Sequence, residues 1–366
     1  MKSVFFVGVI LSLFLWTDEI YAQEAAYDEF GQVIKSTEFS IPVSPAFVML
    51  DATPERIIKP GMPRNFKVDW SLRTYSFQPN LAIEAQPLWH LLYDRAPLSK
   101  YQKANPLLKM LSTLSGSVGI VSRDSLNNLA WGFKMNIYRS RDPLSDPELV
   151  DSLNMLVGGD ERQMMSELRQ LRKQADKLKG RKDAASERSR NTLFQSIDSL
   201  RAELVYFQAM RRETIRELQS RYINRHWNTS MIDVAFARSY VFDRDVTLDS
   251  LSLLSEATGM WVNASVGLGK NWLLSGMAHY TLREISDSFL WGANMRFGNG
   301  RYNFFTEFFM QNFTRQTESN SFTIAYGGDF KLSRSVLLNF SLRNRFSNKI
   351  VLKEILPIAN IICLMR

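Results

Sequence analysis

The sequence contains one cysteine, Cys363, and three histidines, and it lacks any apolar run of about 18 residues. One cysteine excludes a disulfide within the chain and a multi-cysteine metal site. His90, His226 and His279 are not in a metal-ligand spacing, and neither a Gly-x-Ser-x-Gly motif nor a phosphate-binding loop occurs. We therefore expect no membrane-spanning helix, no catalytic, cofactor-binding or metal-binding residues, and no enzyme.

The first 22 residues predict a signal peptide. Lys2 precedes a mainly apolar run from Val4 to Trp16, and Ala22 provides a small residue before the expected cleavage site. This run is too short to span a bilayer and is typical of a secretory signal. We therefore expect export, a mature chain that begins near Gln23, and no nucleic-acid partner.

A period of two in the apolar residues predicts about eleven strands. Phe289, Trp291 and Met295 fall on one face of the stretch 288–297, and Asn294 and Arg296 fall on the other. The sequence Gly-Asn-Gly then predicts a tight turn at 298–300. Similar strands, many of them about as long as a membrane-crossing strand, occur in two blocks, 66–139 and 228–347.

Three segments depart from this pattern. Residues 23–65 contain five prolines, which exclude a long helix and predict an extended periplasmic leader. Residues 140–227 separate the strand blocks, and apolar residues spaced by four and three within 160–222 predict a helical hairpin or coiled coil hinged at Gly180. Residues 348–366 lack alternation and include a proline, so we expect an atypical tail there, and the twelfth strand that an even-numbered barrel needs is not evident.

Two architectures accept such strands. A soluble sandwich buries its apolar faces against each other, whereas a transmembrane barrel turns them to lipid and keeps polar faces in the lumen. Long strands, aromatic residues near strand ends and the export signal favour an antiparallel outer-membrane β-barrel of about twelve strands with a helical insertion. The predicted lumen-lining residues are Lys134, Asp233, Arg283, Arg296, Glu307, Asp329, Lys331 and Arg343.

The signal ending in "YAQ", the proline-rich stretch "SIPVSPAFVMLDATPERIIKPGMPRNF" at 40–66 and the strand pattern resemble outer-membrane β-barrel proteins of Bacteroidota. The resemblance extends over residues 1–346 and implies a location and a fold class, without an activity. Barrels of this kind usually close with a strand that ends in an aromatic residue, whereas this chain ends in Arg366.

Strand counting from a periplasmic N-terminus predicts which connections share an end of the barrel. The turns 269–271, 298–300 and 333–335 and the helical insertion are expected at the periplasmic end. The polar stretches 243–258 and 314–321 are expected outside the cell.

The patterns leave three functions open. The first is a non-enzymatic structural or transport barrel in contact with outer-membrane lipid, whose insertion 160–222 docks an envelope protein or a second copy of the chain. Because the second helix is the longer one, its apolar residues Leu204, Phe207, Ile215 and Leu218 are predicted to bind that partner, unless this helix packs on the barrel rim. The alternatives are a passive pore gated by the insertion and a barrel hydrolase acting on lipid or peptide.

Overall fold

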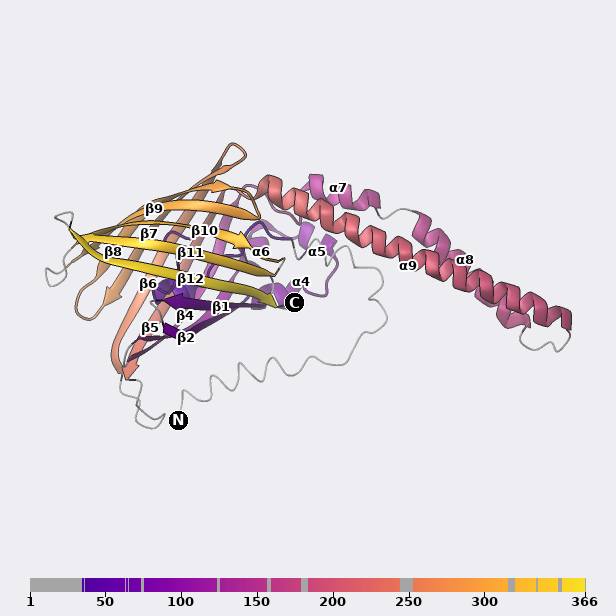
Figure 1. Ribbon diagram of the computed structural model, residues 1–366, viewed down its shortest axis with the longest axis horizontal. Helices are drawn as coiled ribbons and strands as arrows, with labels where there is room; N and C mark the ends of the chain where they lie inside the picture. Colours follow the sequence, from indigo (N-terminus) through magenta and orange to yellow (C-terminus); the bar gives the residue numbers. More distant parts are fainter. Residues whose placement is uncertain are drawn as a thin grey trace.

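A computed structural model describes most of the chain from Lys35 onward. The predicted signal peptide and the start of the leader lie outside the described residues. The described residues form a barrel, a segment inside it and a helical arm that projects from one end (Figure 1). They are 35, 37–62, 64, 66–73, 76–123, 126–156, 159–178, 184–243, 253–314, 320–333, 335–347 and 351–365.

Twelve antiparallel strands form the closed barrel that the sequence predicts. Each strand pairs with its neighbours along the chain, and β1 pairs with β12 from Phe66 opposite Met365 to Arg73 opposite Ile358, which closes the sheet. The strands are β1 (Phe66–Arg73), β2 (Ser76–Ala85), β3 (Ser115–Arg123), β4 (Leu126–Arg139), β5 (Met231–Asp243), β6 (Leu253–Leu268), β7 (Trp272–Arg283), β8 (Ser288–Gly298), β9 (Tyr302–Phe313), β10 (Ser321–Lys331), β11 (Val336–Ser347) and β12 (Leu352–Met365).

The outer wall of the barrel is apolar, because side chains alternate between the two faces of each strand. In β8, Phe289, Trp291 and Met295 are exposed on the outside, whereas Asn294 and Arg296 are buried inside. Such an apolar band around a closed barrel is the surface that transmembrane barrels present to lipid.

The C-terminal residues form β12, so the expectation of an atypical tail is corrected. The apolar-polar alternation is missing because both faces of this strand meet apolar surroundings. Ile358 and Ile362 are buried inside the barrel, where Ile362 packs in an apolar cluster, and Ile355 is exposed on the outside. Pro357 is accommodated opposite Leu342 of β11. The strand count is therefore even, as closed bacterial barrels require.

The strand connections give the barrel two different ends. The helices between β2 and β3 and between β4 and β5 share one end with the short turns after β6, β8 and β10, as the parity of the strands predicts, and we call it the helical end. Gly269 has a φ of 63° in the first of these turns, a conformation that glycine adopts without strain. The connections after β5, β7, β9 and β11 lie at the other end, the loop end. Which end faces the periplasm stays a prediction.

Seven helices accompany the strands in the described part of the chain. Three short ones, α4 (Pro87–Tyr93), α5 (Leu98–Gln102) and α6 (Pro106–Leu111), connect β2 to β3. The insertion between β4 and β5 consists of α7 (Pro147–Leu156), α8 (Gly159–Leu178) and α9 (Ala184–His226). The seventh, α3 (Pro45–Met49), lies inside the barrel and is described below.

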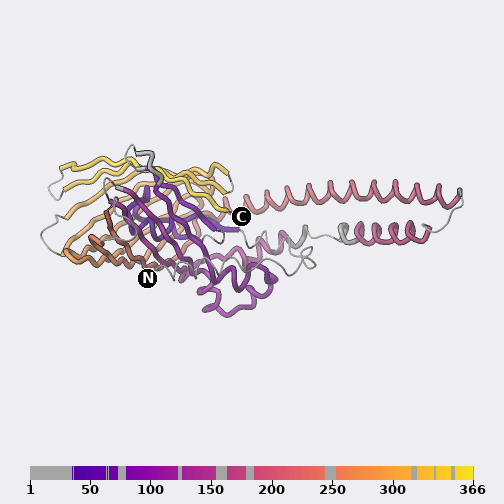
Figure 2. Tube along the Cα trace, turned by 90° about the horizontal axis from the view of Figure 1, so that it is seen from below, coloured from indigo at the N-terminus to yellow at the C-terminus, as the bar shows by residue number. Residues whose placement is uncertain are grey.

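The helical arm is the predicted hairpin of α8 and α9. These helices lie side by side, and α9, with 43 residues, is about 65 Å long (Figures 1 and 2). The arm extends away from the helical end, and α7 packs on the part of α9 nearest the barrel. None of the helices in the described residues is both long and apolar enough to cross a membrane.

Candidate functional site: the plugged barrel interior

Residues 37–62, which we call the plug, occupy the barrel interior. They form a hairpin whose two legs are joined by a hydrogen bond of 2.8 Å from the Ser40 hydroxyl to the Pro60 carbonyl. Asp51 lies at the tip with a φ of 52°, a left-handed conformation that aspartate tolerates better than most residues. The described part of the predicted leader is therefore inside the barrel, and its prolines favour the short, non-repetitive legs of this hairpin.

Apolar packing accounts for part of the plug's contact with the wall. Phe47, Val48 and Ile57 of the plug are fully buried in a cluster that includes Trp261 and Met277 of the wall. Beside α3 the wall residues are small, which lets the helix approach the sheet. A Cβ atom on Gly119 would lie 3.2 Å from the Ala46 Cβ, and one on Gly132 would lie 3.1 Å from the Pro45 Cβ.

Buried carboxylates of the wall accept hydrogen bonds from the plug's backbone. Glu307 of β9 accepts bonds from the amides of Arg56, at 2.9 Å, and Ile57, at 2.7 Å. Asp69 of β1 accepts a bond of 2.9 Å from the Ser44 amide, and Asp233 of β5 accepts one of 3.1 Å from the Gly61 amide. These bonds satisfy backbone donors that the irregular plug cannot satisfy by secondary structure.

Arg343 of β11 binds the tip of the plug. It donates a bond of 3.0 Å to the Pro54 carbonyl and another to the Thr53 carbonyl, and it forms an ion pair of 2.7 Å with Asp51. Asp51 also pairs with Arg56 at 3.1 Å. The guanidinium group thus links the wall to three residues of the tip, Asp51, Thr53 and Pro54.

The seam between the first and last strands is also bound by the plug. The carbonyl oxygen of Ala52 accepts hydrogen bonds of 2.7 Å from the Ser71 hydroxyl of β1 and 3.2 Å from the Asn360 amide of β12. Ser71 and Asn360 are directly paired across the seam.

The eight predicted lumen residues divide into two groups. Six are buried in the interior, and two of these, Arg296 and Asp329, form an ion pair of 2.7 Å that extends to Glu55 of the plug. Lys134 lies 3.4 Å from the Glu84 carboxylate. Arg283 is exposed and Lys331 is half-buried, because both lie at strand ends. The six buried residues are Lys134, Asp233, Arg296, Glu307, Asp329 and Arg343.

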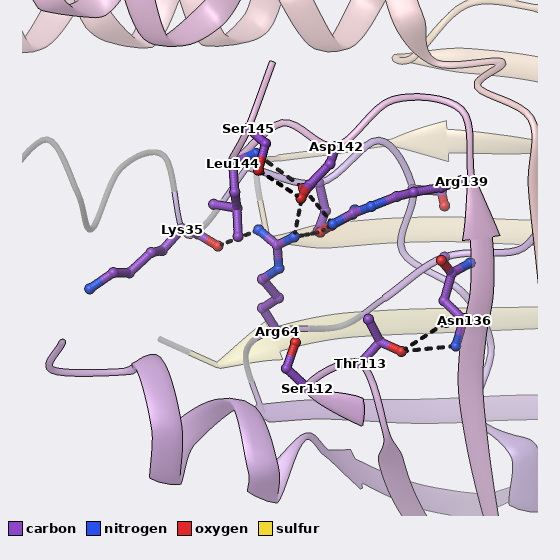
Figure 3. Close-up of polar contacts among 12 residues, drawn as sticks. Lys35, Arg64, Ser112, Thr113, Asn136, Arg139, Asp142, Leu144 and Ser145 are labelled. Carbon is purple, nitrogen blue, oxygen red and sulfur yellow. Dashed lines mark hydrogen bonds and ion pairs between the residues drawn. The ribbon is translucent and has the colours of Figure 1, made fainter. Parts of the chain in front are cut away.

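A polar cluster at the helical end of the barrel joins Glu38 of the plug to Arg64, which follows the plug in the chain (Figure 3). Arg64 pairs with Glu38 at 2.9 Å and with Asp142 at 3.6 Å, and its guanidinium lies 4.8 Å from the Trp89 ring. Arg139, at the end of β4, pairs with the same two carboxylates. The cluster therefore connects the start and the end of the hairpin to the segment that precedes α7.

Ionisation in this cluster follows from its charges. Burial would raise the pKa of Asp142, but the Arg139 and Arg64 guanidiniums outweigh burial and lower that pKa below its ordinary value. The Tyr101 hydroxyl donates a bond of 2.9 Å to Asp142, and burial together with this anion raises the pKa of Tyr101 to about 12. Asp142 is therefore an anion, and Tyr101 neutral, throughout the physiological range.

The pockets found beside the plug are small. One of about 70 Å³ lies near the tip, between Asp51, Arg56 and Arg343, and another of about 40 Å³ lies near Glu55 and Asp329. A water needs about 10–15 Å³ of such space, so each pocket has room for a few waters. In this conformation the lumen is occupied by the plug, whereas the helical insertion projects outside it.

His279, which faces the interior of the barrel, is not part of a recognisable catalytic arrangement. His279 is buried between the Trp261 ring, 4.9 Å away, and the Thr281 hydroxyl, 3.2 Å away. Neither neighbour is a carboxylate that could orient the imidazole. Among the described residues, no group of three His, Cys, Asp or Glu side chains is placed to bind a metal ion.

The four predicted partner-binding residues are largely covered within the chain, which corrects the expectation of an open surface. Leu204 and Ile215 are buried, and Phe207 and Leu218 are half-buried. Ile215 and Leu218 belong to an apolar cluster that also contains residues of α4, α5 and α7, so this part of α9 is covered within the chain. Apolar residues of α4, α5 and α7 contribute to this cover, which the pattern of α9 alone does not reveal.

The solved structures that align with this chain include outer-membrane porins and channels. A KdgM porin in complex with disordered oligogalacturonate aligns with a TM-score of 0.39 and 6% identity, over 82% of this chain and 99% of the porin. The NanC porin aligns with a TM-score of 0.36 and 6% identity, over 82% and 100% of the two chains. The CymD monoaromatic hydrocarbon channel gives a TM-score of 0.32 and 6% identity, over 83% and 90%.

These likenesses are too distant to indicate a substrate or a plug for this chain. No known protein family and no curated protein matches the sequence. The function must therefore be argued from the barrel and its contents.

Proposed function

We propose that this chain is a non-enzymatic outer-membrane β-barrel with a transport or structural role, whose lumen is closed by its own plug in the resting state. The observation that supports this proposal is that side chains of the wall bind the plug's backbone, among them Glu307, Asp233 and Arg343. The apolar outer wall supports a location in the membrane, and the outer membrane is the one that barrels of this kind occupy.

The polar character of the interface between plug and wall favours transport over a purely structural role. Buried ion pairs are no more stabilising than apolar packing of the same volume, so they are a poor way to reinforce a permanent core. Polar groups such as Arg296, Glu307 and Asp329 can instead exchange the plug for water or a solute when the plug moves. The gate of such a channel is then the plug, in place of the helical insertion.

Channel recording tests this proposal. The wild-type protein in a planar bilayer should remain closed for most of the recording, and a variant lacking residues 37–62 should conduct steadily. If that deletion does not assemble, a disulfide between the plug and the wall gives a second test. Ser117 Oγ lies 3.0 Å from the Ala46 amide nitrogen, so cysteines at 46 and 117, in a Cys363→Ser background, are within reach of each other.

Oxidation and reduction of the double-cysteine protein should change the conductance in opposite directions. Oxidation of the double-cysteine protein should abolish its openings, and a reductant should restore them. A steady wild-type conductance that the disulfide leaves unchanged would overturn the plug as gate. The matched control is the Cys363→Ser protein with a single cysteine at 117.

We also propose that the arm docks an envelope partner or a second copy of the chain. The observation in favour is an exposed group of apolar residues in the middle of α9, formed by Val205, Tyr206 and Met210. A photocrosslinker at Tyr206 should capture the partner, whereas one at the exposed Glu187 on the same helix should not. Replacement of 160–222 by a short Gly/Ser bridge should leave an assembled barrel that no longer co-purifies with the partner. Capture that is equal at both positions would contradict this role.

A further inference from the structure

Residues 86–114, which we call the rim segment, expose large apolar side chains at the helical end. Leu91 is 79% exposed and Leu107 is 58% exposed, and Leu108 beside it is also exposed. These leucines do not belong to the apolar core, because other side chains of the segment already fill its inward side. Trp89, Tyr93 and Tyr101 are buried there in an apolar cluster that also includes residues of α7 and α9. The outer surface of the rim segment therefore carries exposed apolar side chains at Leu91, Leu107 and Leu108.

This surface continues the apolar outer wall of the barrel. The segment joins β2 to β3, and α6 contacts β4. On the neighbouring strands, Val118 is 55% exposed and Ile137 and Tyr138 are also exposed. Figure 2 shows the segment outside the outline of the strands, at the end of the barrel that carries the arm. The rim segment therefore lies next to the edge of the apolar outer wall, at the helical end.

The polar residues of the rim segment are predominantly basic. It contains Arg95, Lys100, Lys103 and Lys109 and a single acid, Asp94, which faces His90 at 3.7 Å. Arg95, Lys100 and Lys103 are exposed. Apolar side chains beside flexible basic ones are the combination by which helices bind the surface of an anionic bilayer.

We propose that the rim segment is a lipid-docking site, with its leucines in the interfacial layer of the membrane and its basic side chains on anionic phospholipid headgroups. The proposal rests on the proposed function, since it requires the barrel to be in a membrane. The occupant is lipid because the surface is continuous with the lipid-facing wall and carries the charge that anionic headgroups attract. The short helices then anchor the helical end at a defined depth.

Fluorescence quenching by lipid tests the position of the leucines. In a Cys363→Ser background, single cysteines replace Leu107, Val118 and Phe194, and each carries the same fluorophore. The proteins are folded into vesicles of phosphatidylcholine with one fifth phosphatidylglycerol, a proportion on the order of natural anionic content, and a nitroxide on the acyl chain near the headgroup is the quencher. Val118 reports the barrel wall, and Phe194 reports the exposed arm. Lipid should quench the labels at 107 and 118 and leave the label at 194 unquenched.

The outcomes separate this inference from the proposed function. Quenching at 118 with none at 107 would overturn the lipid-docking site and leave the membrane barrel intact. The absence of quenching at 118 would overturn the membrane barrel and, with it, the docking site. A label at 107 that is quenched no more than the one at 194 contradicts the proposal in either case.

A second measurement tests the preference for anionic headgroups. With the nitroxide placed on phosphatidylglycerol or on phosphatidylcholine, the label at 107 should be quenched more by the anionic lipid. The variant Arg95→Gln, Lys100→Gln, Lys103→Gln should lose this difference. A matched triple change on the arm, Arg169→Gln, Arg172→Gln, Lys173→Gln, should keep it. Loss of the difference in both variants would indicate a general charge effect and would overturn the headgroup site.

Discussion

Replacement of Glu307 by glutamine tests one buried polar contact between plug and wall. The carboxylate is fully buried and accepts bonds from the amides of Arg56 and Ile57, at distances down to 2.7 Å. Glutamine has nearly the same shape, but it is uncharged and its nitrogen cannot accept, so the Arg56 amide loses its bond of 2.9 Å and both amides must share one neutral oxygen. A hydrogen bond to a charged group contributes about 1.5–3 kcal/mol, and an unsatisfied buried donor costs about 1–3 kcal/mol.

These magnitudes overlap, so we expect the closed state to lose about 2–3 kcal/mol, which corresponds to a roughly 30- to 150-fold increase in plug opening. Hydrogen exchange of the Arg56 and Ile57 amides measures this directly, and single-channel recording should show more frequent openings. The matched control is Glu256→Gln, which removes a half-exposed ion pair with Arg238 and leaves the plug untouched. Because surface pairs contribute about 0–1 kcal/mol, the control should stay within about fivefold of wild type. Equal exchange in the two variants would refute the assigned role of Glu307.

Three further predictions concern the wall, the plug's seat and pH. Ala293→Arg, on the lipid face of β8, should destabilise the barrel by about 2–4 kcal/mol in urea unfolding, whereas Ala293→Leu should not. Gly119→Leu should displace α3 and raise conductance, since even a Cβ there lies 3.2 Å from the Ala46 Cβ. Gly276→Leu, whose Cβ would meet only the Gly292 oxygen at 3.6 Å, should leave the channel closed. The polar cluster should be insensitive to pH between about 8 and 5 and should loosen below about pH 4, where Asp142, with its lowered folded-state pKa, becomes protonated. Hydrogen exchange of residues 37–40 would follow this loss, and Asp142→Asn should remove the pH step.

Eleven of the twelve strands were predictable because each has one apolar and one polar face. The period of two in β8 or β9 directly reflects lipid on one side and a polar interior on the other. β12 was not predictable in this way, because Ile358 and Ile362 face an interior that the plug makes partly apolar. Local patterns report the environment of a strand, and here the environment is created by residues far away in the sequence.

The plug itself was missed for a related reason. An extended, proline-rich segment has no period that distinguishes an external leader from an internal hairpin. A signal was present on the wall, where the inward positions Gly119, Ala130, Gly132, Ala235 and Ala237 are small on three consecutive strands. Small residues on the inner face indicate that something bulky lies against it. The charges were predicted as lumen-lining, but a sequence pattern does not tell whether such charges meet water or a backbone.

The carbonyl of Ala52, shared by Ser71 and Asn360, has a consequence for assembly. The strands that carry these two side chains are separated by nearly the whole chain, so the closing pair carries the largest loop-closure entropy of any pairing in the barrel. A slip of one residue between them would turn Asn360 from the interior to the lipid face. With Ala52 in place, only one register brings both donors to the same oxygen. The bound hairpin therefore favours the correct register of the closing pair over a slipped one.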